Sequence, residues 1–221
     1  MTKLFASLLM ILLLAATAWG ADPMMARIRA LEPLIGTFPP NIRPAEAKAT
    51  KKRYEGLKSE LDARIAAHPQ DQDLLFMRGY LQSMGHNFDY PGAWQGATDD
   101  LQAVLHANPG HIAAMTALAN LWVNSNPALA PEAEKLFRNA QCRQGREPVE
   151  EAQRGLFFAF YYQGKMREAL RQSEYLQQTW PDNEQYRRYN ETIRAVLLRA
   201  EDYQAPPVPL SGKVDMTTCD K

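Results

Sequence analysis

The sequence predicts an all-α protein built from stacked pairs of helices. From Ala45 to Ala205, apolar residues recur at intervals of three and four, and no long stretch alternates with a period of two. Prolines also follow the last apolar turn of successive segments, at Pro69, Pro109 and Pro181. Their intervals are 40 and 72 residues, and 72 is two units of 36. Periods of this size are typical of repeated helix–turn–helix units.

The first twenty residues resemble a secretory signal peptide. A lysine at position 3 precedes an unbroken run of apolar and small residues from Leu4 to Ala18. Ala18 and Gly20 then supply the small residues that a signal peptidase reads. We therefore expect a signal peptide at 1–20, a mature chain beginning near Ala21, and a periplasmic or secreted protein. An uncleaved signal acting as a membrane anchor is the alternative, although the apolar run is short for a membrane span.

Prolines divide the two ends of the mature chain from its helical body. Residues 21–44 form an N-terminal segment that ends in a proline-rich linker containing Pro39, Pro40 and Pro44. Proline lacks the amide that a helix interior needs, and it favours an extended conformation at the residue before it. The cluster at 206–209 likewise predicts an extended tail over 205–221.

Two of the repeated units share a turn motif. In each, a glycine is followed by an alanine five residues later, and a proline follows that alanine by 12 residues. The two sets are Gly92, Ala97, Pro109 and Gly164, Ala169, Pro181. This motif resembles the turn and second helix of a tetratricopeptide repeat (TPR).

The remaining units match the TPR pattern less completely. The middle unit has Ala133, Phe137 and Ala140, but Gly145 occupies the proline position. Phe157 also departs from the pattern, because it stands where the other first helices carry a glycine or an alanine. The resemblance implies a right-handed α-solenoid over 45–183, with a partial unit at 45–69, full units at 72–109, 112–145 and 150–183, and a capping helix at 184–204. Each pair must stack on its neighbours, because it cannot bury its apolar face alone.

In the TPR family the first helix of each pair lines a concave groove that holds a partner. Carrying these positions onto this sequence gives aromatic residues at both ends, with amides and one cation between them. Asparagine can pair with a peptide backbone, and arginine can hold a carboxylate through two bonds. The alternative is that the aromatic members are core residues. The predicted partner-binding residues are Phe76, Tyr80, Met84, Thr116, Asn120, Asn124, Arg154, Phe158 and Tyr161.

Two further features leave alternatives open. Cys142 and Cys219 would face an oxidising compartment after export, where a disulfide persists, but two unpaired thiols fit the sequence equally well. The first full unit also carries six extra residues around 86–91. Their aromatic residues, Phe88 and Tyr90, either contact a ligand or pack against a neighbouring helix, and we favour packing.

The sequence contains no motif for catalysis, for a metal or for a cofactor. No two histidines are spaced for a paired-histidine metal site, and no glycine-rich phosphate loop occurs. Carboxylate pairs such as Asp99 with Asp100 are explained as solvated charges on helix faces. Lysine and arginine together number 25, as do aspartate and glutamate, so no net charge attracts nucleic acid or a membrane surface.

We therefore expect a scaffold or adaptor that binds another exported or envelope protein, without a cofactor or a metal. Two alternatives come from other classes: an envelope enzyme with an unrecognised site, and a structural oligomer that associates through its aromatic residues. Metal dependence or turnover would favour the enzyme, and a mass that rises with concentration would favour the oligomer.

Overall fold

The computed structural model describes residues 23–199 and residue 219, and the part of the chain that it describes is helical, without a strand. The elements are α1 (Pro23–Arg29), α2 (Glu32–Ile35), α3 (Pro44–Ala67), α4 (Gln72–Asn87), α5 (Ala93–Ala107), α6 (Ile112–Ser125), the short 3₁₀ turn η1 (Pro127–Leu129), α7 (Ala130–Gln144), α8 (Glu150–Tyr162), α9 (Met166–Thr179) and α10 (Glu184–Arg199). The predicted all-α class is confirmed.

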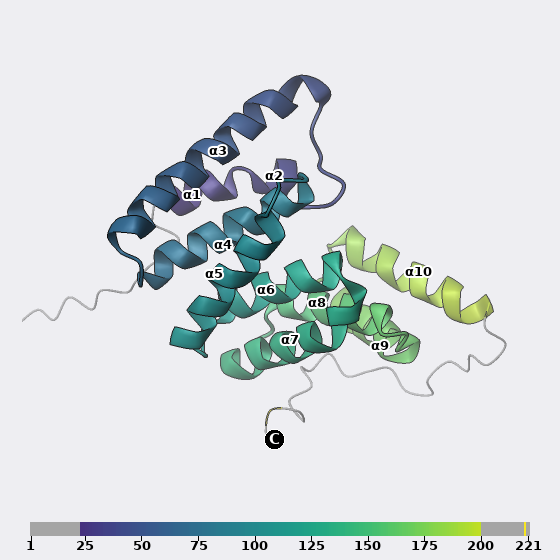
Figure 1. Ribbon diagram of the computed structural model, residues 1–221. Helices are drawn as coiled ribbons and strands as arrows, with labels where there is room; N and C mark the ends of the chain where they lie inside the picture. The colour runs from purple at the N-terminus through teal and green to yellow at the C-terminus, as the bar shows by residue number, and fades with distance from the viewer. Residues whose placement is uncertain (1–22, 200–218, 220–221) are drawn as a thin grey trace, which may run out of the picture.

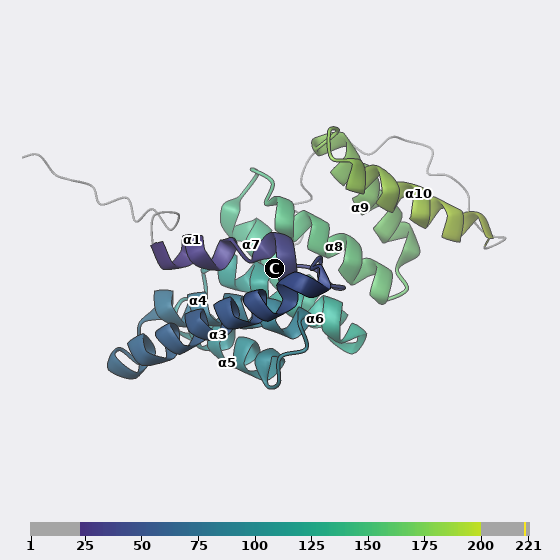
Figure 2. The same ribbon diagram turned by 90° about the horizontal axis from the view of Figure 1, so that it is seen from above.

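The helices pack in the order in which they follow one another along the chain. Each helix from α3 to α9 contacts the next one, and the array runs from α1–α3 at one end to α9 and α10 at the other (Figures 1 and 2). Alternate helices also touch, since α6 contacts both α4 and α8. At the N-terminal end, α1 and α2 both lie against α4, and α1 also contacts α3.

Three helices end where the prolines predict. α3 stops at Ala67, α5 at Ala107 and α9 at Thr179, each two residues before Pro69, Pro109 or Pro181. The residue between helix and proline has a non-helical backbone in all three cases, as the ring of a following proline requires.

The shared turn motif also has a structural basis. Gly92 and Gly164 have positive φ angles of 73° and 71°, which a residue with a side chain adopts only at a cost. Five residues later, Ala97 and Ala169 are fully buried. The glycine therefore turns the chain, and the small alanine lets the second helix approach its neighbours closely.

The departure at Phe157 is explained by α10. Phe157 is buried, and its ring lies parallel to that of Tyr189 on α10, with centroids 4.8 Å apart. The small residue of α8 is instead Gly155, where an added Cβ would overlap the ring of Phe137 on α7. The predicted capping helix at 184–204 corresponds to α10, which is described as far as Arg199.

The extra turn at 86–91 packs against α3. The ring of Tyr90 lies 4.3 Å from that of the buried Tyr54, and its hydroxyl donates to Glu55. The ammonium of Lys51 lies 5.5 Å from the centre of the same ring. This turn is therefore anchored through its aromatic residues, as we expected.

The buried apolar residues form two clusters. The N-terminal cluster contains buried residues from α1 to α6, and the C-terminal cluster contains buried residues from α6 to α10. Within the predicted segment 21–44, α1, α2 and the turn between them contribute Met24, Met25, Ile28, Leu31 and Ile35 to the first cluster. The predicted signal peptide (1–20) lies outside the described residues, as does the predicted tail apart from residue 219.

Candidate functional site

Three of the nine predicted partner-binding residues lie in the core. Phe76, Met84 and Thr116 are 6%, 3% and 3% exposed. Phe76 and Met84 belong to the N-terminal cluster, to which α1 and α2 contribute. The Thr116 hydroxyl donates to the carbonyl of Ala113 in its own helix. These three side chains present almost no surface to a partner. For Phe76 this is the alternative that the sequence left open, and Met84 and Thr116 are buried as well.

Tyr80 is half-buried and held by α2. Its hydroxyl donates to Oε1 of Glu32 at 2.8 Å, and its ring stacks on Phe76 with centroids 5.9 Å apart. Burial, together with the nearby Glu32 carboxylate, raises the pKa of Tyr80. Nearby, Asn87 donates to the carbonyl of Ile35 at 3.1 Å. The α2 segment therefore occupies the side of α4 that the sequence assigned to a partner.

The other five predicted residues lie on α6 and α8, two helices that contact each other, and they remain accessible. Asn124 is exposed, and the other four are half-buried. On α6, Nδ2 of Asn124 donates to the backbone carbonyl of Asn120, which places the two side chains one turn apart on one face. We call the surface formed by Asn120, Asn124, Arg154, Phe158 and Tyr161 the α6–α8 face.

Arg154 is the cation of this face, and its charge acts on two tyrosines of α10. Burial raises the pKa values of Tyr186 and Tyr189, and the positive charge of Arg154 opposes both shifts. Tyr186 is separately fixed, because its hydroxyl donates to Oε1 of Glu150 at 2.6 Å. Among the described residues, the Arg154 side chain makes no hydrogen bond and no ion pair.

Aromatic contacts hold the rest of the face rigid. Phe158 meets Tyr189 edge-on at 5.2 Å between centroids, and Tyr161 stacks on Phe157 at 6.4 Å. Phe157 and Phe158 also meet edge-on at 5.2 Å. These contacts fix the rings of Phe158 and Tyr161 while leaving each ring partly exposed.

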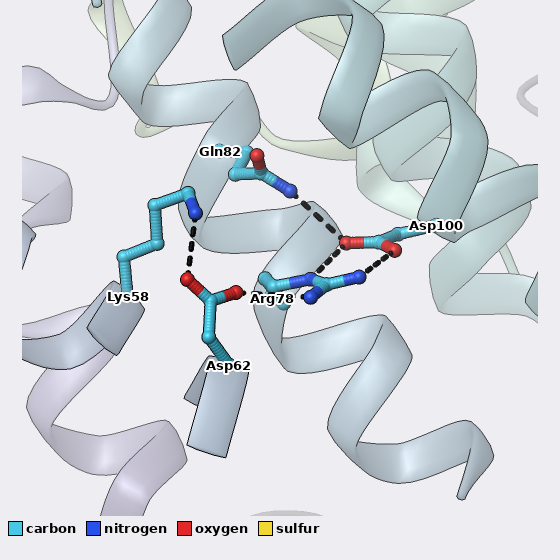
Figure 3. Close-up of polar contacts among 5 residues, drawn as sticks. All are labelled: Lys58, Asp62, Arg78, Gln82 and Asp100. Carbon is cyan, nitrogen blue, oxygen red and sulfur yellow. Dashed lines mark hydrogen bonds and ion pairs between the residues drawn. The ribbon is translucent and has the colours of Figure 1, made fainter. Parts of the chain in front are cut away.

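A cluster of charges that the sequence analysis missed lies between α3, α4 and α5. Figure 3 shows Arg78 of α4 between Asp62 of α3 and Asp100 of α5. Nε and Nη2 of Arg78 donate to the two oxygens of Asp100 at 2.8 and 2.7 Å, and Nη1 donates to Asp62 at 2.9 Å. Gln82 adds a hydrogen bond of 3.0 Å to Asp100, and Lys58 adds one of 2.8 Å to Asp62.

The buried position of Asp100 corrects the sequence analysis. We expected Asp99 and Asp100 to be solvated, but Asp100 is only 5% exposed. Partial burial opposes ionisation of Asp62, yet the hydrogen bonds from Lys58 and Arg78 outweigh that effect and lower its pKa. The hydrogen bonds of Arg78 with Asp100, and then that with Asp62, raise the pKa of Arg78. The cluster joins three helices. Its polar atoms are engaged with one another, which indicates a structural role.

A second network of this kind joins α7 to the turn between α8 and α9. Glu134 accepts hydrogen bonds from Arg138, Gln163 and Lys165 at 2.8–2.9 Å. Burial opposes its ionisation, but these three donors outweigh burial and lower the pKa of Glu134. All three donors are side chains of this chain, so this network also has a structural role and links α7 to the turn between α8 and α9.

The histidines give no metal site. Among the described residues, no group of three or more histidine, cysteine, aspartate or glutamate side chains is placed to hold a metal ion. His111 instead caps α6, because its Nδ1 accepts a hydrogen bond of 3.0 Å from the amide of Ala114.

Within the same described part of the chain, no helix combines the length and apolar character needed to cross a membrane.

The cap formed by His111 makes the fold sensitive to mild acid. Burial lowers the pKa of His111 from its ordinary value of 6.5. The neutral ring therefore stabilises the fold fully above pH 6.5, and this stabilisation is lost as the pH falls through the lower folded value. We expect urea denaturation to give a free energy of unfolding at pH 5 that is lower than at pH 7.5 by up to about 1 kcal/mol, the usual contribution of an N-cap.

His111→Asn is the matched control for this prediction, since asparagine caps a helix without titrating. The variant should lose most of the difference in stability between pH 7.5 and pH 5. An unchanged difference would show that other groups cause the pH dependence.

Comparison of this chain with protein-family models, with curated proteins and with solved structures found no match. The candidate site therefore rests on the geometry of the α6–α8 face.

Proposed function

We propose that this protein is an exported adaptor that binds a segment of another envelope protein on the α6–α8 face. The observation that carries the proposal is the half-buried Arg154, which has no hydrogen bond or ion pair among the described residues. A guanidinium held in this way is able to donate two parallel hydrogen bonds to a carboxylate.

The surroundings of Arg154 suit an extended peptide. Asn120 and Asn124 offer side-chain amides that can donate to and accept from a peptide backbone. The rings of Phe158 and Tyr161 are already fixed by aromatic contacts, so they lose little freedom when a partner covers them. The partner segment thus carries an acidic side chain next to an apolar one.

We further propose that the helix pairs form a right-handed solenoid of the TPR type. The sequential packing from α3 to α10, the contacts of α6 with α4 and α8, and the repeated turn motif support this architecture. In this arrangement α1 and α2 together act as the first helix of a pair completed by α3. The α6–α8 face then lies on the inner side of the array.

Two features support the proposal that the protein is exported: its N-terminal sequence and its pair of cysteines. The first twenty residues have the layout of a signal peptide. Cys142 and Cys219 are joined in a disulfide, which persists in oxidising compartments such as the periplasm. Both features are expected of a chain that works outside the cytoplasm.

A site-specific photo-crosslinker tests the proposed face. One variant carries the photoreactive residue at Asn124, and the matched control carries it at Asn139, which is equally an exposed asparagine but lies on α7. Irradiation in envelope extract should give a defined crosslinked product from position 124 and none of that mass from position 139. Equal labelling at both positions would contradict a specific site on α6 and α8.

A further inference from the structure

The disulfide encloses the last three helices of the fold. Cys142 lies on α7, and its bond to Cys219 spans 77 residues of sequence, with the two Cα atoms 5.4 Å apart. The closed loop therefore contains the whole of α8, α9 and α10. Both cysteines are half-buried, so a small dithiol can reach the bond.

The enclosed helices share one core and have no part in the other. Every buried apolar residue of α8, α9 and α10 in the two clusters belongs to the C-terminal cluster. The N-terminal cluster draws its residues from α1, α3, α4, α5 and neighbouring segments, and α6 alone contributes substantially to both. The loop thus encloses only helices of the C-terminal cluster, while α7 and part of α6 contribute to that cluster from outside the loop.

A crosslink stabilises chiefly by restricting the chain that it encloses once that chain unfolds. Proteins also open in parts, and each part has its own free energy of opening. When α8–α10 alone open, the chain inside the loop gains conformational freedom. The disulfide limits that gain, so it opposes this opening. Opening of α3–α5 alone releases no residue inside the loop, so the disulfide leaves it unaffected.

We infer that the Cys142–Cys219 disulfide is a redox-sensitive latch for α8–α10. In its reduction, a dithiol donates two electrons and two protons, the S–S bond breaks, both cysteines become thiols, and the dithiol becomes a disulfide. The reduced protein keeps α3–α5 closed, while α8–α10 open more often. Since α8 carries Arg154, Phe158 and Tyr161, reduction also weakens the α6–α8 face; this last consequence rests on the proposed function.

Hydrogen–deuterium exchange followed by mass spectrometry tests the latch without any partner. The samples are the oxidised protein, the same protein reduced with dithiothreitol, and the Cys142→Ser/Cys219→Ser variant. The usual stabilisation by a disulfide, 2–4 kcal/mol, corresponds to about 30- to 1,000-fold in an opening equilibrium. We expect the slowest amides of α8–α10 to exchange faster by that factor in both altered samples, and those of α3–α5 to change less than about threefold.

Three results would overturn the inference. Unchanged exchange in α8–α10 after reduction would show that the disulfide does not hold these helices closed. An equal rise in α3–α5 and α8–α10 would show that the disulfide stabilises the whole fold. Reactive thiols in the purified, unreduced protein would show that the bond does not form. Reoxidation should restore the original pattern. None of these results depends on whether a partner binds the α6–α8 face.

Discussion

Arg78→Met should lower the free energy of unfolding by about 3–5 kcal/mol, because it leaves the buried Asp100 carboxylate without its partner. Asp100 is only 5% exposed and takes two of its hydrogen bonds from Arg78. The remaining donor, Gln82, is neutral and cannot offset a buried negative charge. Denaturation by urea at neutral pH, followed by circular dichroism, measures the change.

Two further variants separate this effect from a general loss of surface charge. Lys58→Met breaks the exposed ion pair with Asp62 and should cost less than about 1 kcal/mol. Arg78→Met combined with Asp100→Leu removes the half-buried cation together with the buried carboxylate, so most of the lost stability should return. If Arg78→Met cost no more than Lys58→Met, the cluster in Figure 3 would not be the link between α3, α4 and α5 that we describe.

Gln141→Met should lower the free energy of unfolding by about 3 kcal/mol, since the loss of a buried hydrogen-bonding group leaves several partners unsatisfied. Gln141 is 3% exposed, and its Nε2 donates to the carbonyls of Gly145 and Glu147 at 2.7 and 2.9 Å. Its Oε1 accepts from the amide of Val149 at 2.9 Å and from Nε2 of Gln153 at 2.7 Å. The same denaturation experiment measures the loss.

Gln144→Met is the matched control, because Gln144 is an exposed glutamine on the same helix. This substitution should change the free energy by less than about 0.5 kcal/mol. Equal effects of the two substitutions would mean that the hydrogen bonds of Gln141 do not hold the turn between α7 and α8.

Gln141 also accounts for a feature that the sequence left unexplained. The middle unit lacks the proline that ends helices in the other units, and it has Gly145 there instead. In the structure, Gln141 binds the carbonyl of Gly145 and the amide of Val149, so a side chain fixes this turn where the others use a proline ring. A buried glutamine in a helix carries no distinctive spacing, and for that reason the sequence could not indicate this role.

The helices could be predicted because the signals that fix them are local. The prolines that end α3, α5 and α9 and the glycines that open α5 and α9 act on the backbone beside them. Apolar periodicity likewise reports which residues of a helix face a neighbour. These signals need no knowledge of which helices meet.

The candidate site was predicted less completely, because its exposure depends on distant segments. Phe76 and Met84 occupy suitable positions on α4, yet they are buried in a cluster that includes residues of α1 and α2, which precede α3 in the chain and contact α4. Asp100 looked solvated because its partner, Arg78, is 22 residues away on another helix. Periodicity alone cannot show that these residues meet.

The affinity of the protein for its crosslinked partner tests the central claim most directly. One variant combines Asn120→Ala, Asn124→Ala and Arg154→Ala on the α6–α8 face. Its control combines Gln102→Ala, Asn139→Ala and Lys135→Ala at exposed positions of α5 and α7, so each variant loses two amides and one positive charge. Circular dichroism first establishes that both fold.

Calorimetry then measures binding to the purified partner. We predict that the first variant binds about 30-fold or more weakly than the unaltered chain, as expected when an interface loses a central contact, while the control binds within about threefold. Equal affinities for both variants would contradict the assignment of partner binding to the α6–α8 face.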